Sequence, residues 1–584
     1  MEIDSDPRGE ASSPGRTAWW SCAAITVVCL AVALPTVRSD NYFLGDDFGL
    51  VQHLHDLPAK RLLSYFASDW TEGIYGFQLD ELRPFLAFTY WLDARLFGSV
   101  NVSGYHTTNL VLHLLNALLV LAIARSIAPG QPAFAVLAAS LFALMPSHSE
   151  PVGWISGRVD SLAALFYLGA FLCFVRFRLG NRYTWLFAAL LVFTCGLFAK
   201  QSIVTFPVLI LAFDLLERGS QAAERWSFSR LWPHLLFFAL VALYLALRQT
   251  LFGNAVRENM LTGAVLEEFF FRQSRYVREL LPTPNSAPRG LRVAAEVVTI
   301  CMLAACLRWV LARRQAHSHV VRHLIFFGVA WYGITIAPMV VTYLSARHLY
   351  ITTAGLSIAL ASLVLPGYPV EERRRTRMRK AMAGVLIALY AVASIWNVSN
   401  WVSSGIESHS FAAAVPRLLQ SVPRGSIVFV GVPGWHRDGW FWSWTTPFAL
   451  QPPFTAEDIY SKFTIVEPSA VYCCPPDQWW AAKKTTLMAL MDSPEPKEVT
   501  YIVFAPDSPA APVFTTRTID GRGLKRRIEA TLGKSVESFS ATITPEEAQG
   551  LSRILFELGD HHVDRKAAKP AATLSEGTSY AKDR

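Results

Sequence analysis

The sequence has 584 residues, of which 52% are hydrophobic and only 17% are charged. A soluble domain carries charge on about a quarter of its residues, so this composition, with its repeated apolar runs of about 20 residues, excludes an ordinary soluble protein and predicts a multi-pass membrane protein. The net charge of +8 does not indicate a nucleic-acid partner, because the basic residues gather in short loops between apolar runs, as in cytoplasmic loops.

The N-terminal segment, residues 1–16, is polar and rich in Pro, Gly and Ser, and we predict a disordered cytoplasmic leader there. An apolar run follows at 17–37, and Arg8 and Arg16 before it place the N-terminus inside. This run is longer than the apolar part of a signal peptide and lacks a convincing cleavage site, so we interpret it as a retained anchor. Further spans are predicted near 106–128, 133–148, 158–177, 183–199, 202–217, 231–250, 291–312, 322–343, 347–366 and 381–400.

An odd number of spans, about eleven, explains where the basic residues lie. With the first span running outward, the loops that fall inside are the Arg-rich ones, at 176–182, 218–230, 313–322 and 373–380. A miscount by one would scatter these clusters over both sides. We therefore predict an extracytoplasmic C-terminus, and the Arg-rich, Lys-poor composition favours a bacterial inner (plasma) membrane.

A large first outer loop, residues 38–105, is rich in acidic residues and carries the adjacent pair Asp46 and Asp47 near its start. Carboxylates at a membrane surface are costly to desolvate, so a pair there indicates a functional site. The pair also precedes a helical-looking stretch at 48–55, and Asp is a preferred helix N-cap. From the residues alone, the aspartate pair could therefore supply a catalytic base or a helix cap.

A second outer loop, at about 251–290, contains a helical-looking stretch at 266–281. Arg272, Arg275 and Arg278 recur there at three-residue spacing among apolar residues. An amphipathic helix lying in the membrane interface fits this pattern, and so does a helix whose arginines merely extend to lipid headgroups.

The composition changes from Trp401 onward. Strand-like runs at 426–430 and 501–504 and a helical-looking stretch at 545–558 predict a small extracytoplasmic α/β domain over 401–564, after a transmembrane domain over 17–400. Residues 565–584 are expected to form a disordered tail, and no tetratricopeptide period follows the last span.

Polar residues recur at the predicted outer ends of the spans. They are Arg83, His106, His148, Glu150, Arg158, Asp160, Lys200 and Arg347. Cations gathered with carboxylates at one membrane face suit chemistry on an anionic phosphate, so Lys200, Arg347 and Arg158 are the phosphate-binding candidates. A lone cation at the end of a span can instead extend to the headgroups.

His148 and Glu150 allow two interpretations. Together with the aspartates they could build a divalent-cation site of mixed oxygen and nitrogen ligands. We favour a proline-bracketed turn with a satisfied histidine, and so assign no metal ligand. Asp160 is expected to act by position, paired with Arg158 or His106.

Five sequence motifs belong together. They are Asp46-Asp47, Gly104-Tyr-His106…Asn109…His113…Asn116, Pro146…His148…Glu150…Trp154…Arg158-Val-Asp160, Lys200…Pro207 and Arg347-His-Leu-Tyr350. This set resembles the GT-C glycosyltransferases, and specifically the protein O-mannosyltransferase-like branch that includes the transmembrane and tetratricopeptide O-mannosyltransferases. Two departures from that branch are Gln201, where Glu usually follows Lys, and the missing repeat tail.

The resemblance implies a GT-C-like polytopic helical membrane fold and a glycosyltransferase that uses a polyprenyl-phosphate sugar. Asp46 matches the first acidic residue of the family pair and is the expected general base, with Asp47 second; the acceptor hydroxyl attacks with inversion and the lipid phosphate leaves. Arg83, His106, His148, Glu150 and Asp160 are expected to support the site. The acceptor is a protein, lipid or glycan, and a divalent cation is the one cofactor left open. A transporter or flippase, or a non-catalytic binder of lipid-linked sugar, is the rival interpretation.

Overall fold

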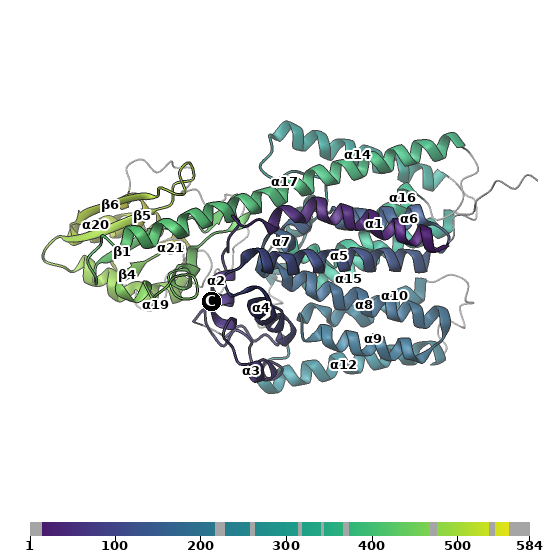
Figure 1. Ribbon diagram of the computed structural model, residues 1–584, viewed down its shortest axis with the longest axis horizontal. Helices are drawn as coiled ribbons and strands as arrows, with labels where there is room; N and C mark the ends of the chain where they lie inside the picture. Colours follow the sequence, from purple (N-terminus) through teal and green to yellow (C-terminus); the bar gives the residue numbers. More distant parts are fainter. Residues whose placement is uncertain are drawn as a thin grey trace, which may run out of the picture.

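A computed structural model describes residues 14–76, 78–216, 228–256, 263–312, 318–339, 344–365, 373–467, 476–536 and 544–559. It is elongated, with a helical bundle at one end and a smaller α/β domain at the other (Figure 1). Most of the expected disordered leader and the whole expected tail, 565–584, lie outside the described residues. The last three leader residues are helical, because the first helix already begins at Pro14.

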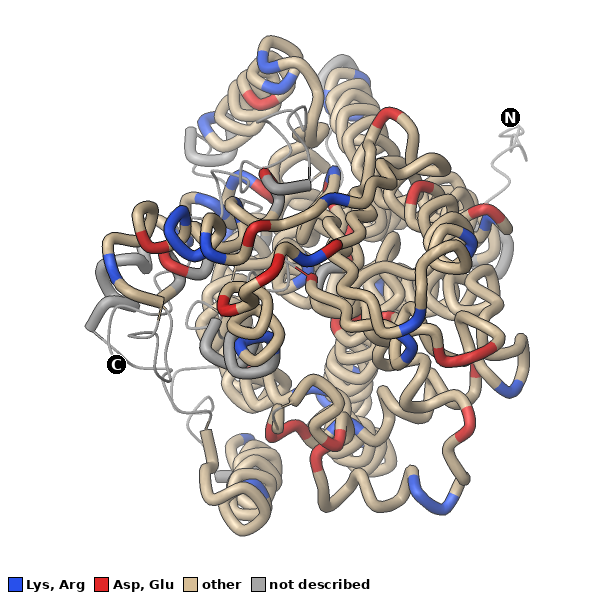
Figure 2. Tube along the Cα trace, turned by 90° about the vertical axis from the view of Figure 1, so that its left-hand side faces the viewer, with Lys and Arg blue, Asp and Glu red and all other residues tan. Residues whose placement is uncertain are grey.

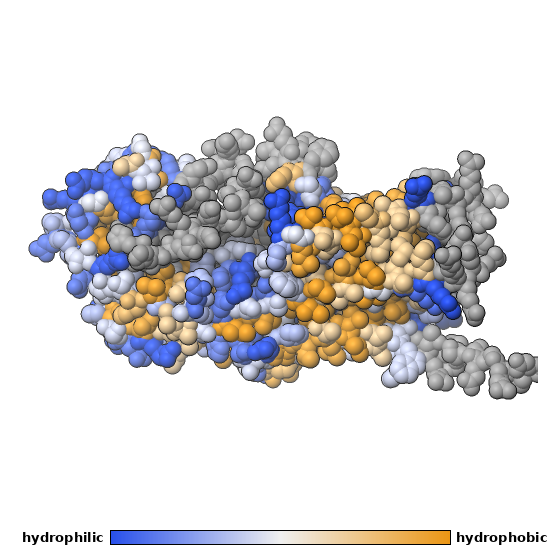
Figure 3. All heavy atoms as spheres, turned by 90° about the horizontal axis from the view of Figure 1, so that it is seen from above, coloured by the Kyte–Doolittle hydropathy of each residue, from blue (hydrophilic) through white to orange (hydrophobic). Residues whose placement is uncertain are grey.

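The bundle matches the predicted spans helix for helix. Its helices are α1 (Pro14–Ala33), α5 (Val102–Ile127), α6 (Pro132–Ala143), α8 (Arg158–Gly180), α9 (Tyr183–Leu197), α10 (Phe206–Leu216), α12 (Phe228–Phe252), α14 (Arg289–Ala312), α15 (Ser318–Ile336), α16 (Thr352–Val364) and α17 (Arg373–Leu419). Figure 3 shows the broad apolar surface of this bundle beside the more hydrophilic α/β domain. The chain is thus a polytopic α-helical membrane protein.

The number of membrane crossings stays a prediction. Among the described residues, seven helices are long and apolar enough to cross a membrane. An eighth candidate is α6 together with the segment Pro146–Gly153, which is bent by 50° at the break between them. The three remaining apolar helices, α9, 201–216 and α16, are shorter, and the count of eleven depends on them.

Polar side chains on α5 connect the helices near the break. The Asn109 amide donates to the carbonyl of Trp154 at 3.0 Å, and the Asn116 amide donates to the carbonyl of Ser161 at 2.7 Å. Where helices are surrounded by lipid, such hydrogen bonds join segments that the hydrophobic effect alone does not hold together. They fix the short helix α7 (Ser149–Gly153) and the start of α8 against α5.

The first outer loop forms α2 (Asp47–Leu54), α3 (Ala59–Ser64) and α4 (Pro84–Phe97). These helices lie beside the bundle, at its junction with the C-terminal domain (Figure 1).

Helix α17 runs without a break from the bundle into the C-terminal domain (Figure 1). The predicted last span, 381–400, is therefore only its middle part, and the change of composition at Trp401 does not end the helix. Its polar residues beyond that point have tertiary partners: Ser408 Oγ donates to the carbonyl of Phe43 at 2.8 Å, and Ser404 Oγ to the carbonyl of His436 at 2.9 Å. These contacts stabilise the part of α17 after residue 400, which hydropathy alone does not predict to be helical.

The C-terminal domain is built on a four-stranded sheet with the order β4-β1-β5-β6. Its strands are β1 (Ile427–Gly431), β4 (Thr464–Val466), β5 (Lys497–Val503) and β6 (Val513–Ile519). Strand β1 is parallel to β4 and β5, and β6 is antiparallel to β5. The helices α19 (Pro476–Met491), α20 (Gly521–Leu532) and α21 (Pro545–Gly559) complete the predicted α/β domain. Between β1 and β4, the hairpin β2 (Trp435–His436) and β3 (Gly439–Trp440) and the short α18 (Thr446–Ala449) contact the first outer loop or α17.

Candidate active site

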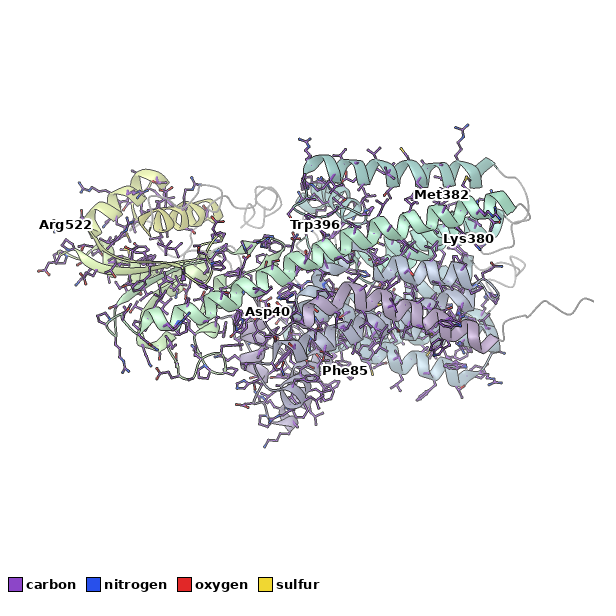
Figure 4. The ribbon with its side chains drawn as sticks, turned by 45° about the horizontal axis from the view of Figure 1, so that its top comes forward. Asp40, Phe85, Lys380, Met382, Trp396 and Arg522 are labelled. Carbon is purple, nitrogen blue, oxygen red and sulfur yellow. The ribbon has the colours of Figure 1, made fainter. Side chains whose placement is uncertain are left out.

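The site predicted from the sequence gathers where the bundle, the first outer loop and the C-terminal domain meet. Asp40, labelled in Figure 4, marks this junction just before the aspartate pair. Viewed along the long axis from the domain end, acidic and basic residues are distributed over several segments of the molecule (Figure 2).

Asp46 stands at the first position before α2, but its side chain makes no capping hydrogen bond. Its Oδ1 accepts instead from the indole Nε1–H of Trp444 at 3.0 Å. Its Oδ2 has no hydrogen-bond partner in the described part of the chain, and the residue is half-buried. Burial raises the pKa of Asp46 above its ordinary value, although the Trp444 hydrogen bond and the charge of Arg347 act to lower it. The carboxylate of Asp46 is therefore held through Oδ1, and Oδ2 is available to accept a hydrogen bond.

Asp47 is fully buried, and both of its oxygens are occupied. Oδ1 accepts from the backbone N–H of Ser156 at 2.8 Å and from its hydroxyl at 2.5 Å, while Oδ2 accepts from the N–H of Leu44 at 3.0 Å. Burial raises the pKa of Asp47 to about 7, against these hydrogen bonds. Asp47 thus fastens the loop that carries Asp46 to the segment before α8.

Arg347 lies in the short helix η6 (Ala346–Leu349) and faces two carboxylates. Its Nε is 3.8 Å from Oε1 of Glu150 and 3.7 Å from Oδ2 of Asp160. Glu150 also accepts hydrogen bonds from the hydroxyl of Ser345 and from the backbone N–H of Arg347. The guanidinium lies over the Trp154 ring, 4.9 Å from its centroid, a favourable cation–π position. These contacts hold Arg347 close enough to Asp46 for its positive charge to oppose the rise that burial causes in the pKa of that carboxyl.

Lys200 lies at the turn between α9 and the short helix η4 (Gln201–Thr205) and forms a buried ion pair with Asp160. Burial lowers the pKa of Lys200, and the neighbouring charges of Arg347 and Arg83 lower it further. Arg83 is itself paired with Glu81 at 2.7 Å. Lys200 is thus within electrostatic reach of two other predicted cations, Arg347 and Arg83.

Arg158 does not join this group. Its side chain is fully buried, with Nη1 2.5 Å from Oδ2 of Asp93 and Nη2 donating to the carbonyl of Tyr105 at 2.8 Å. Its Nε donates to Oδ1 of Asn109 at 3.0 Å, and its guanidinium lies 4.6 Å from the centre of the Tyr90 ring. The guanidinium is therefore committed to partners within the protein.

The expected pairing of Asp160 with Arg158 or His106 is wrong, because Asp160 binds Lys200. Residues two apart on a helix point in different directions, so Arg158 and Asp160 at the start of α8 reach different partners. The Nε2 of His106 lies 3.0 Å from the amide nitrogen of Asn41 instead.

His148 and Glu150 belong to separate networks. The Nε2 of His148 is 2.8 Å from the hydroxyl of Thr353, whereas Glu150 is bound by Ser345 and Arg347. In the part of the chain that the structure describes, no three His, Cys, Asp or Glu side chains are grouped as a metal site. The Nδ1 of His148 is buried without a hydrogen-bond partner among the described residues, so this histidine is only partly satisfied by the turn, and the choice between the two interpretations stays a prediction.

The Arg-rich stretch of the second outer loop forms α13 (Gly263–Glu279). Beside it is a cavity of about 170 Å³, lined by Pro146, Arg275, Arg278, Glu279, Leu281, Thr283, Asn285 and Arg292. Burial, together with the nearby carboxylates of Asp438 and Glu150, raises the pKa of Glu279 to about 7. The cavity therefore lies near the site and is lined by more basic than acidic side chains.

Sequence reasoning missed several residues that shape the site. Trp444, Asp93, Ser156 and Ser345 each bind a predicted site residue. The concentration of tryptophan at 435–444 is a usable signal for Trp444, but no local spacing links that segment to Asp46.

The comparisons find no family model that matches the chain. Over 221 residues it is 26% identical to the protein O-mannosyl-transferase TMTC4 of Homo sapiens, a match that covers 34% of this chain and 29% of the relative. Over 135 residues it is 32% identical to Tmtc1 of Drosophila melanogaster, covering 23% of this chain and 15% of the relative. The matches thus span less than a third of these curated relatives.

Two solved structures are similar over most of the chain. ArnT from Cupriavidus metallidurans, bound to undecaprenyl phosphate, has a TM-score of 0.42 and 10% identity, covering 83% of this chain and 93% of that one. AglB from Archaeoglobus fulgidus, in complex with an inhibitory peptide and a dolichol-phosphate, has a TM-score of 0.45 and 11% identity, covering 83% and 69%. The chain is therefore a polytopic helical membrane protein that is similar, over part of its length, to protein O-mannosyl-transferases.

Proposed function

We propose that the protein transfers a sugar from a polyprenyl-phosphate donor to an acceptor hydroxyl, with inversion, at the extracytoplasmic face of a bacterial inner membrane. Asp46 is the general base. The observation that carries this proposal is the contrast within the acidic pair: Asp46 keeps Oδ2 without a partner among the described residues, close to Arg347, whereas Asp47 is used in three hydrogen bonds.

The reaction needs a base and a site for the leaving phosphate. Oδ2 of Asp46 takes the proton of the acceptor hydroxyl as the hydroxyl oxygen bonds to the anomeric carbon. The bond from that carbon to the phosphate oxygen breaks, and its electron pair leaves with the lipid phosphate. Lys200 and Arg347, with Arg83 nearby, stabilise the developing charge.

The carboxylates paired with these cations hold them ready for the donor. Asp160 binds both Lys200 and Arg347, and Glu150 binds Arg347. The two carboxylates hold the side chains of Lys200 and Arg347 in place before the donor binds, so little reorganisation is needed when the phosphate leaves.

The remaining predicted residues position the site. Asp47 anchors the loop, and Arg158 joins α4, α5 and α8 through Asp93, Tyr105 and Asn109. We therefore assign Arg158 to the scaffold and leave Lys200 and Arg347 as the phosphate-binding pair.

The distribution of charge supports the proposed orientation. Lys380, in a basic stretch of α17, lies at the end of the bundle away from the C-terminal domain (Figure 4). Positive residues favour the cytoplasmic side, so the aspartate site and the domain face outward. The matched relatives are named protein O-mannosyl-transferases, which makes mannose and protein hydroxyls the first substrates to test.

The test is sugar transfer by the full-length protein in lipid nanodiscs, with polyprenyl-phosphate-[³H]mannose and a panel of peptide, lipid and glycan acceptors. We expect Asp46→Asn to reduce transfer by a factor on the order of 10²–10⁴, the usual contribution of a general base, while donor binding is retained. Asp56→Asn is the matched control, because Asp56 is an exposed carboxylate of the same loop. Transfer by Asp46→Asn at the wild-type rate would refute the proposal.

A further inference from the structure

The C-terminal domain reaches Asp46 through Trp444. The indole Nε1–H donates to Oδ1 of Asp46 at 3.0 Å, although the two residues are 398 positions apart. Only 9% of Trp444 is exposed, and its ring packs edge-on against Trp440 at 5.1 Å between centroids. The indole is therefore held in place by its own domain.

The backbone of the same two segments is also joined. The N–H of Gly45 donates to the carbonyl of Phe441 at 3.0 Å. Gly45 has φ +51°, and a Cβ there would lie 2.9 Å from the Cβ of Trp440. A side chain at position 45 would be strained in this conformation and would push the two segments apart. The loop that carries Asp46 is thus fitted against residues 440–444.

We infer that the C-terminal domain completes the active site and that Trp444 is a positioning residue for Asp46. The inference rests on the proposed role of Asp46 as the base. The indole holds Oδ1 and so orients Oδ2 toward the acceptor hydroxyl. A carboxylate kept in one orientation is more effective as a base than one that rotates freely.

The groups around Asp46 determine in which direction its pKa changes when the indole is removed. The Trp444 N–H and the positive charge of Arg347 favour the ionised carboxylate, whereas burial and the negative charge of Glu81 favour the neutral form. The neighbouring Asp47 is a further acidic group, and its carboxyl interacts electrostatically with Asp46. Removing the indole donor therefore raises the pKa of Asp46, and more of the base is protonated at a given pH.

The experiment compares the pH dependence of kcat/KM for Trp444→Phe and for the full-length wild type. We expect the acidic limb of the Trp444→Phe profile to move to higher pH by about one unit, the size expected for one hydrogen bond to an ionised group. Trp442→Phe is the matched control, because Trp442 donates a buried hydrogen bond of 2.9 Å to Ser408 from the same segment. Its profile should keep the wild-type position even if less folded protein is recovered.

A second measurement does not require the Trp444 variant to fold. In wild-type protein labelled with 5-fluorotryptophan, one ¹⁹F resonance should titrate with the acidic limb of the activity profile, and that titration should vanish in Asp46→Asn. The inference is overturned if no resonance titrates in this way, or if Trp444→Phe lowers activity equally at every pH. If Asp46→Asn is inactive while Trp444→Phe leaves the profile unmoved, only this inference fails. If Asp46→Asn is fully active, the proposed function fails first.

Discussion

Replacing Arg158 with methionine should reduce stability and leave donor affinity nearly unchanged. Arg158 and Asp93 have side-chain exposures of 0% and 2%, so removing the arginine leaves a carboxylate buried without its ionic partner. Breaking a buried ion pair in this way costs about 3–5 kcal/mol. Asp93 keeps a 2.5 Å hydrogen bond from the hydroxyl of Thr108, which places the expected loss at the lower end, about 3 kcal/mol.

The assay is unfolding of the purified protein in detergent, followed by tryptophan fluorescence as denaturant is added, alongside the KM for the donor. The double variant Arg158→Met with Asp93→Leu should recover most of the lost stability, because removing both charges leaves no unpaired ion. An Arg158→Met protein as stable as the wild type, with a donor KM raised tenfold or more, would show that Arg158 binds the donor and would refute this reasoning.

Three further outcomes are expected. Lys200→Met should reduce kcat/KM for the donor at least tenfold, because it removes a positive charge beside the leaving phosphate. Lys200→Arg keeps the charge and should reduce kcat/KM less. Equal activity in Lys200→Met and wild type would argue against this role. Burial raises the pKa of Asp46 above the ordinary value of 3.8, so the base is lost, as pH falls, at a higher pH than for an ordinary aspartate. The acidic limb of kcat/KM should therefore have its midpoint above 3.8, and a midpoint at or below that value would contradict this. In Gly405→Ala the added Cβ would lie 1.8 Å from Oδ1 of Asn41, whereas in Gly384→Ala, on the same helix, it would meet nothing within 4 Å. Thermal unfolding should therefore show that Gly405→Ala lowers the free energy of unfolding by about 1–3 kcal/mol and that Gly384→Ala barely changes it. Equal losses in the two variants would contradict this.

The sequence was sufficient to predict the helices of the bundle, because each apolar run is a local property. It also predicted that Asp46, Lys200 and Arg347 would gather, because the parity of the spans assigns their connecting loops to one side. The strands at 427–431 and 497–503 were recognisable by the same kind of local pattern.

The partners of these residues could not be predicted. Asp160 binds Lys200, 40 residues away, rather than Arg158, two residues away, because the choice depends on how α8 packs against the turn before η4. The Trp444 contact to Asp46 depends on the C-terminal domain folding back onto the first loop. The continuation of α17 beyond residue 400 likewise depends on tertiary partners such as Phe43 and His436.

Single-turnover sugar transfer by Asp46→Asn and Asp47→Asn, each at saturating lipid-linked donor, tests the account most directly. Asp46→Asn should bind donor, unfold like the wild type and fail to transfer the sugar. Asp47→Asn should be less stable, because it disturbs three buried hydrogen bonds, and its folded fraction should still transfer. The opposite pattern, with transfer retained by Asp46→Asn and lost by folded Asp47→Asn, would contradict the assignment of Asp46 as the base.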